Sequence, residues 1–200
     1  RIVEQLARFG FGQRTGVDLA DGAGLLPNPA WKERVRRDAW YIGDTYNVSI
    51  GQGDLRVTPL QLARATAAIA NGGRLVTPHL ARRITDSNGA TFEEIRLPST
   101  DLGIPPGDLV IVRRGMREAV TIGSSRALAD LPVAAAGKTG TAQVGGGKTH
   151  AWFTGYAPAD NPELVLTVIV EEGGEGSTVA VPVAKELFAW YFGNKTTDGQ

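Results

Sequence analysis

The sequence predicts an α+β fold in which an antiparallel sheet is flanked by helices. Residues 131–170 contain three strand-like runs separated by turn-forming residues, including the glycines at 145–147, which predicts a three-stranded antiparallel meander. Apolar residues recur at helical spacing over residues 2–9 and 177–192, which predicts a helix near each end of the chain. Because 42% of the 200 residues are hydrophobic, the chain can bury a core. We expect one domain over residues 1–194 and a polar tail over residues 195–200.

The N-terminal part is expected to contain one helix, a loop-rich stretch and a second helix. The first helix places Ile2, Val3, Leu6 and Phe9 on one face and ends at Gly10, and residues 13–57 are expected to be mostly loop. In the second helix Thr58 is the predicted N-cap, with Pro59 in the first turn and Gln61 completing a capping box. The helix is expected to stop at residues 71–73, and its buried face is predicted to comprise Leu62, Ala65, Thr66 and Ile69.

The remaining elements follow from turn signals and periodicity. Residues 80–85 and 91–97 are predicted to form a hairpin around the turn at 86–89. A further helix is expected over residues 105–123, with a buried face made of Leu109, Val112, Met116 and Val120. The C-terminal helix is expected to bury Val181, Ala184, Leu187, Phe188 and Tyr191.

Composition narrows the possible functions. The chain has 21 Lys and Arg residues and 21 Asp and Glu residues, so it lacks the basic excess expected of a nucleic-acid-binding surface. It has no cysteine, which excludes disulfides and thiolate metal sites, and no His, Asp and Glu cluster predicts a metal or other cofactor. No apolar run approaches the roughly 20 residues of a membrane span.

The most informative stretch is the predicted strand at residues 136–142. It contains Lys138, Thr139, Gly140 and Thr141. On a strand the two threonines share one face and the lysine lies on the other. A glycine inside a strand often marks a place where another group approaches the backbone closely. An ammonium, two hydroxyls and backbone N–H groups suit an anionic ligand or a developing oxyanion, although the residues also fit an edge strand with a solvated lysine.

This stretch resembles the Lys-Thr-Gly motif of the penicillin-binding proteins and serine β-lactamases. Further segments resemble, in order and spacing, the class B penicillin-binding proteins, most of all the elongation type, penicillin-binding protein 2. They are Phe9–Gly12, Thr15–Leu19, Trp40–Tyr41, Gly43–Asp44, Gly51–Gly53, Thr58–Ala63 and Trp152–Pro158. The resemblance covers nearly the whole chain and implies the C-terminal part of the transpeptidase fold. It also implies that the turn at residues 51–53 lies near the site.

The resemblance implies a role for each motif residue in a peptidoglycan D,D-transpeptidase. Lys138 would hold the hydroxyl of the family's second motif and neutralise substrate charge. Thr139 and Thr141 would bind the terminal carboxylate of a D-Ala-D-Ala stem peptide or of a β-lactam, with Gly137 as a further substrate-binding residue. The N–H of Thr141 would be the second oxyanion donor. Gly140 would leave room for close approach.

The other two catalytic motifs of the family are absent from this sequence. No serine is followed three residues later by lysine, and no serine or tyrosine is followed two residues later by asparagine. We therefore expect the nucleophilic serine to lie upstream of Arg1, and we expect the isolated chain to be poorly folded and inactive. The resemblance further implies a membrane anchor outside this chain, the periplasmic face of the bacterial inner membrane, and a membrane glycosyltransferase partner.

Several other functions are also considered for this sequence. An inactive transpeptidase-like domain that binds cell-wall, divisome or elongasome partners would carry the same motif. A carboxypeptidase differs only in using water as the acyl acceptor. A soluble β-lactamase of the same fold fits less well, because the turn at residues 51–53, the segment Thr58–Gln61 and the C-terminal helix resemble the synthases. A phosphate loop at Gly147-Lys148-Thr149 lacks the required glycine at position 142, and we expect strand rather than helix after it. His150 is more simply a strand-start histidine than a site residue.

Overall fold

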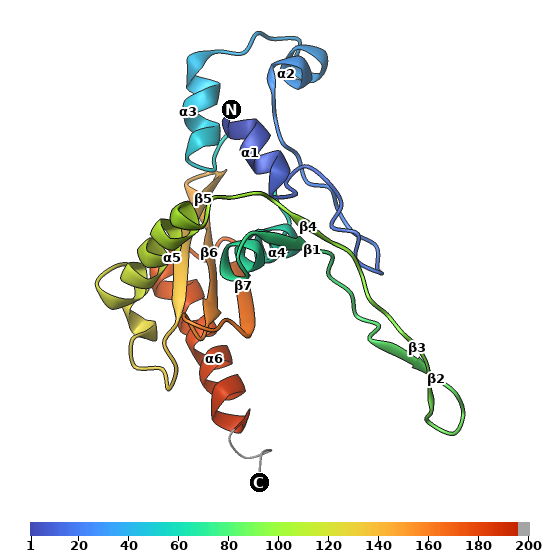
Figure 1. Ribbon diagram of the computed structural model, residues 1–200. Helices are drawn as coiled ribbons and strands as arrows, with labels where there is room; N and C mark the ends of the chain where they lie inside the picture. Colours follow the sequence, from blue (N-terminus) through green and yellow to red (C-terminus); the bar gives the residue numbers. More distant parts are fainter. Residues whose placement is uncertain (196–200) are drawn as a thin grey trace.

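The computed structural model describes residues 1–195 and confirms the mixed helical and antiparallel architecture (Figure 1). The α-helices are α1 (Ile2–Arg8), α2 (Pro29–Arg36), α3 (Ile42–Ser49), α4 (Pro59–Ala70), α5 (Pro106–Thr121) and α6 (Val181–Lys195). The strands are β1 (Arg74–Val76), β2 (Arg83–Thr85), β3 (Thr91–Glu94), β4 (Ser99–Asp101), β5 (Ala136–Gly145), β6 (Lys148–Ala157) and β7 (Leu164–Val170). Short helical turns are η1 (Arg126–Leu128) and η2 (Gly176–Ala180).

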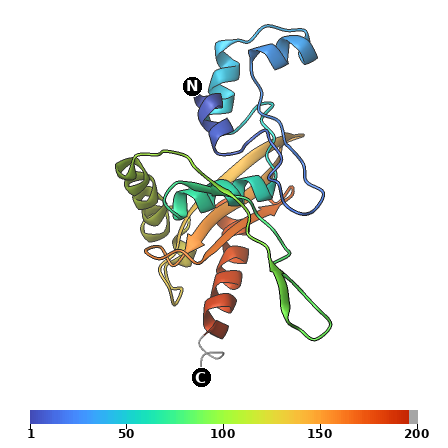
Figure 2. The same ribbon diagram turned by 45° about the vertical axis from the view of Figure 1, so that its right-hand side comes forward.

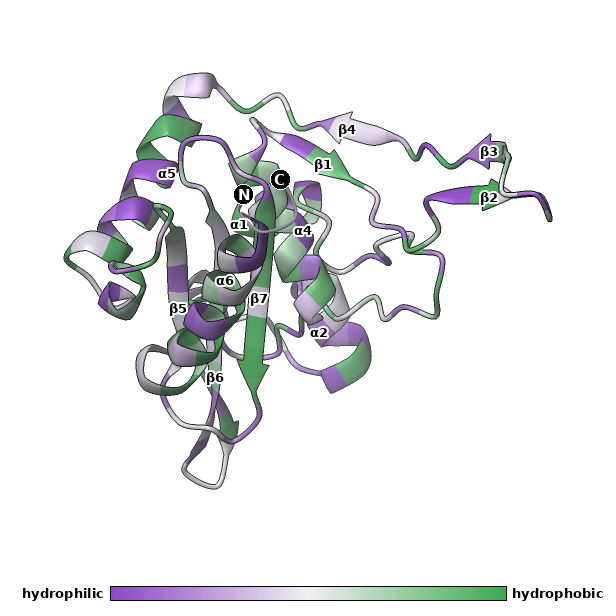
Figure 3. Ribbon diagram, turned by 90° about the horizontal axis from the view of Figure 1, so that it is seen from below, coloured by the Kyte–Doolittle hydropathy of each residue, from purple (hydrophilic) through white to green (hydrophobic). Residues whose placement is uncertain are grey.

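The predicted antiparallel meander is the central sheet, with strand order β5-β6-β7. Its first strand begins at Ala136 rather than at residue 131, because residues 131–133 form a bend around Pro132, which has no N–H for a ladder. Figure 3 shows that β7 is hydrophobic along most of its length. That pattern is typical of a strand covered on both faces.

Helices cover both faces of this sheet (Figures 1 and 2). On one face, Thr154 of β6 meets Thr66 of α4, with 2.7 Å between their hydroxyl oxygens. On the other face, Phe153 packs in one apolar cluster with Phe188 of α6. Helix α5 lies along β5, and Met116 from this helix packs with the cluster on the α4 face. The sheet therefore lies between α4 and α6, and α5 packs along β5.

Helix α4 begins as the sequence predicts. The Thr58 hydroxyl accepts from the Gln61 N–H at 3.1 Å, and the Gln61 side chain accepts from the Thr58 N–H at 2.9 Å. Gln61 is 1% exposed, and its amide also donates to the carbonyls of Gln13 and Ala23. One capping residue therefore fastens the N-terminal loop to α4.

The region at residues 13–57 is more helical than expected, because it contains α2 and α3. The start of α2 carried a recognisable signal: Asn28 accepts from the Trp31 N–H at 2.9 Å and Pro29 occupies the first helical position. Both helices have only eight residues. Tertiary packing decides whether helices this short form. The pairing of β1 with β4 was not predicted either, because it joins strands of three residues across a long insertion.

Some predicted core positions are wrong. Val112 in α5 and Leu187 in α6 are each 44% exposed, whereas Phe192 is buried beside Phe188. The apolar stripe of α6 therefore follows residues 181, 184, 188 and 192, which is a narrower face than the sequence indicated. Lys195, which was assigned to the tail, is the last residue of α6 and forms an ion pair with Glu163. The rest of the expected tail, 196–200, lies outside the described residues.

The predicted hairpin is confirmed as β2 and β3, and it projects from the body of the domain (Figure 2). It is shorter than expected, since only residues 83–85 and 91–94 are strand. Within residues 1–195, none of the helices has the length and apolar character required to cross a membrane.

Candidate active site

The predicted motif lies on the outer edge of the central sheet. Within residues 1–195, β5 pairs with β6 on one side, and side chains meet its backbone groups on the other side. The Thr141 carbonyl accepts from the Gln52 side chain at 3.1 Å. The N–H and carbonyl of one strand residue point to the same side, so the Thr141 N–H also faces away from β6. The same holds for the N–H and carbonyl of every second residue along this edge, including Thr139.

Lys138 leaves the strand on the face covered by α4. It lies directly opposite Thr154, whose hydroxyl meets α4. Its side chain is exposed, and its ammonium folds back onto the edge to donate to the Thr139 carbonyl at 2.7 Å. The cation therefore lies beside the outward-facing peptide groups.

Thr139 and Thr141 lie on the opposite face, as the alternation predicts. They are paired with Phe153 and Ala151, which belong to the cluster that packs on α6. The Thr139 hydroxyl oxygen lies 2.7 Å from that of Ser124, and the Thr141 hydroxyl accepts from the Gly176 N–H at 3.5 Å. One edge is thus flanked by an ammonium from one face and two hydroxyls from the other. Such a set is suited to a carboxylate and to an oxyanion.

The glycines of the motif are in different surroundings. Gly137 is buried, and a Cβ at this position would lie 2.5 Å from Cε2 of Phe153. At Gly140 a Cβ would lie 3.3 Å from the Cβ of Trp152, which is tight but closer to tolerable. Gly137 was predicted to bind substrate. In the structure, its missing side chain makes room for the Phe153 ring.

Three further residues belong to this edge, and the motif alone did not indicate them. The Gln52 side chain binds β5 at two points, because besides donating to the Thr141 carbonyl it accepts from the Gln143 N–H at 3.4 Å. The turn at residues 51–53 therefore lies beside the motif, as the resemblance implied. Gly176 of η2 is needed because a Cβ there would lie 2.5 Å from the Gly140 carbonyl. Ser124 carried no sequence signal, since it precedes the motif by a loop of irregular length.

Two of the alternatives are settled by local geometry. Lys148 and Thr149 are the first residues of β6, so strand rather than helix follows the glycines, and the phosphate-loop interpretation fails as expected. His150 accepts from the Glu172 N–H at 2.9 Å, which is an ordinary structural hydrogen bond. Lys148, Thr149 and His150 therefore belong to the hairpin between β5 and β6 rather than to a second site.

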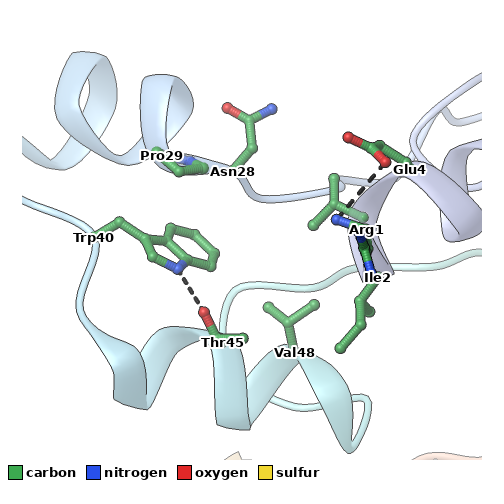
Figure 4. Close-up of a pocket in the computed structure, with 9 residues that line it drawn as sticks. Arg1, Ile2, Glu4, Asn28, Pro29, Trp40, Thr45 and Val48 are labelled. Carbon is green, nitrogen blue, oxygen red and sulfur yellow. Dashed lines mark hydrogen bonds and ion pairs between the residues drawn. The ribbon is translucent and has the colours of Figure 1, made fainter.

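A cavity of about 460 Å³ lies elsewhere, between α1, the start of α2 and α3 (Figure 4). Its wall includes Ile2, Trp40 and Val48, and the Trp40 indole donates to the Thr45 hydroxyl at 2.8 Å. The motif residues do not line it. The lining is mainly apolar and contains no acid–base or nucleophile pair, so the β5 edge rather than this cavity is the candidate site.

The family model for the penicillin binding protein transpeptidase domain matches residues 1–189. Peptidoglycan D,D-transpeptidase MrdA of Acinetobacter baumannii is 40% identical in an alignment 202 positions long, gaps included, which covers 93% of this chain and 30% of that protein. MrdA of Haemophilus influenzae is 37% identical and covers 98% of this chain, and 33% of its length is matched. The chain thus spans about a third of the length of these curated relatives.

Solved structures agree with the sequence comparisons. Penicillin-binding protein 2 in its complex with MreC from Helicobacter pylori has a TM-score of 0.78 and 34% identity, covering 92% of this chain and 34% of that one. A chain from a peptidoglycan synthase complex, described for its coordination of polymerization and crosslinking, has a TM-score of 0.82 and 39% identity, covering 96% and 33%. The chain therefore belongs to the penicillin-binding protein transpeptidase domain family, and within it resembles penicillin-binding protein 2.

Proposed function

We propose that the intact protein is a peptidoglycan D,D-transpeptidase and that this chain supplies the strand that binds the substrate beside the nucleophile. The observation that carries the proposal is the β5 edge, where the Lys138 ammonium and the hydroxyls of Thr139 and Thr141 flank outward-facing peptide groups. The nucleophilic serine comes from outside this chain, because the sequence has no Ser-x-x-Lys pair. The names of the similar proteins support the same reaction.

The chemistry of acyl transfer fits this edge. The serine oxygen attacks the carbonyl between the two terminal D-alanines, the C–N bond breaks, and the terminal D-alanine leaves with a proton on its amine. The amine of a second stem peptide then attacks the ester and restores the serine. The outward N–H of Thr141 stabilises the oxyanion in both steps, and one such donor contributes about 2.7–4 kcal/mol in a comparable enzyme.

The remaining motif groups bind and orient the donor peptide. Its C-terminal carboxylate accepts hydrogen bonds only, which matches hydroxyl donors at Thr139 and Thr141. Lys138 supplies positive charge from the other face of the strand and reaches the Thr139 carbonyl, so its ammonium lies beside the outward-facing peptide groups of the edge. The arrangement favours a donor laid along β5.

Partner and location are further parts of the proposal. One similar structure is a complex of penicillin-binding protein 2 with MreC, and another is a synthase complex that coordinates polymerization with crosslinking. We infer a comparable assembly for the intact protein, with a membrane glycosyltransferase partner on the extracytoplasmic face of the bacterial inner membrane.

The test is covalent labelling of the intact protein with a fluorescent penicillin. Lys138→Ala is expected to slow labelling about 10- to 100-fold, because it removes a charged hydrogen-bond donor. Lys148→Ala is the matched control, since Lys148 is also an exposed lysine but lies at the start of β6 and pairs with Glu172. Equal labelling of Lys138→Ala and the native protein would overturn the role of Lys138. A folded intact protein that does not label at all would instead be the inactive binding domain.

A further inference from the structure

Ser124 stands at a defined position beside the motif, although it belongs to a different part of the chain. Its hydroxyl oxygen is 2.7 Å from the Thr139 hydroxyl oxygen, 15 residues further on. The Ser124 side chain is exposed on the same edge of the sheet as the motif. The contact is between two side chains that each carry one proton and can each donate or accept.

The backbone around Ser124 is held on both sides. Gly123 packs against α5 so closely that a Cβ there would lie 2.8 Å from the Ala119 Cα. The next residue, Ser125, is fully buried, and its N–H donates to the Ala119 carbonyl at 2.9 Å. Leu128 of η1 is 1% exposed and belongs to the core cluster on the α6 face. The turn that carries Ser124 is therefore fixed by α5 and by the core, and this places the Ser124 hydroxyl next to Thr139.

The hydroxyl pair has a direction once an anion is bound. A carboxylate offers only acceptors, so the Thr139 proton must point toward it. The Thr139 oxygen is then left to accept the proton of Ser124. Successive hydrogen bonds in such a chain strengthen one another in a site of low dielectric. Ser124 thus sets Thr139 as a donor.

We propose that Ser124 is a positioning residue that orients the Thr139 hydroxyl and so increases the preference of the site for a peptide ending in a carboxylate over one ending in a carboxamide. This rests on the proposed transpeptidase function. A carboxamide brings an N–H₂ donor of its own and gains less from a hydroxyl that is fixed as a donor. Ser124 acts through Thr139 and does not need to touch the substrate.

The experiment measures acylation of the intact protein by two matched donors. Both are thioesters of N-benzoyl-D-alanine, one with a mercaptoacetate leaving group and one with mercaptoacetamide. Ser124→Ala is expected to slow acylation by the mercaptoacetate donor about 3- to 10-fold, the size of one hydrogen bond, and to slow the mercaptoacetamide donor much less. Ser124→Thr retains the hydroxyl and should keep the native preference. Ser87→Ala, in the exposed hairpin turn, is the control.

A double-mutant cycle separates this role from a structural one. In a Thr139→Val background the hydroxyl to be oriented is gone, so Ser124→Ala should have no further effect on the preference. Equal loss with both donors, or an unchanged preference in Ser124→Ala, would overturn the inference while leaving the proposed function intact. If Ser124→Ala does not fold, Ser124→Cys, which keeps the size and only a weak donor, gives the same readout. A native protein that neither donor acylates would reject the proposed function and this inference with it.

Discussion

Replacing Gly137 by alanine tests how the motif strand is packed. An alanine Cβ would lie 2.5 Å and 2.6 Å from two ring carbons of Phe153 and 3.1 Å from the Thr154 carbonyl oxygen. Carbon atoms in contact normally lie about 3.5–4.0 Å apart, so the ring would have to move by roughly 1 Å. Phe153 is fully buried and packs against α6, which leaves little room for that movement.

The expected destabilisation follows from this overlap. Overpacking a well-filled core costs about 1–3 kcal/mol, and the size of the overlap favours the upper part of that range. For a domain of this size, each kcal/mol lowers the melting temperature by about 2–4 °C, so about 2–3 kcal/mol corresponds to a decrease of roughly 4–12 °C. The assay is differential scanning calorimetry of the intact protein, following the transition that shifts when penicillin is bound.

A compensating change makes the prediction sharper. Phe153→Leu removes the ring carbons that an alanine at 137 would meet, and by itself destabilises through the cavity it leaves. The double variant should be more stable than the sum of the two single changes predicts, with a coupling of about 1–2 kcal/mol. An unchanged melting temperature in Gly137→Ala would refute the packing argument. If that variant also lost penicillin labelling, Gly137 would instead clear space for the ligand.

Gln52→Ala should increase hydrogen exchange at the outer amides of β5, because the Gln52 side chain is bound to the Thr141 carbonyl and to the Gln143 N–H. Unchanged exchange would show that these two hydrogen bonds do not protect the strand. A second prediction concerns pH. Hydrogen bonds from Lys32 lower the pKa of Asp38 and of Asp44 below the ordinary 3.8, so their contribution to stability is present above pH 3.8 and is lost as the pH falls through the lowered values. The pKa of Lys32 is raised above 10.5, chiefly by its hydrogen bond to Asp44, so its contribution is complete below pH 10.5 and is lost only as the pH rises through the raised value. The protection factors over residues 28–54, which compare each exchange rate with that of the unfolded chain at the same pH, should therefore fall below about pH 4 and stay level at neutral pH, and a fall that begins near pH 6 would contradict this assignment.

Much of the fold could be predicted because local signals agreed with one another. The capping box at Thr58 and Gln61, the glycine turn before Lys148 and the apolar run of β7 each specify one element without reference to the rest of the chain. The predictions were wrong where the exact limits of a helix's buried face had to be chosen. Val112 and Leu187 are apolar and at acceptable helical spacing, yet each is 44% exposed, whereas Met116 and Phe188 on the same helices are buried.

The candidate site divides in the same way. By itself the sequence determined the motif strand and the alternation that places Lys138 opposite Thr139 and Thr141, because strand periodicity is a property of the local backbone. Only the tertiary structure decided that Ser124 joins that edge, since it is brought there by a turn whose position depends on packing far from the motif. The resemblance implied that the turn at residues 51–53 lies near the site, but only the tertiary structure showed which strand groups Gln52 binds. The tertiary structure also decided why residue 137 is a glycine. The Phe153 ring, which occupies the space of a side chain at position 137, comes from the next strand, and this contact could not be assigned before the register was known.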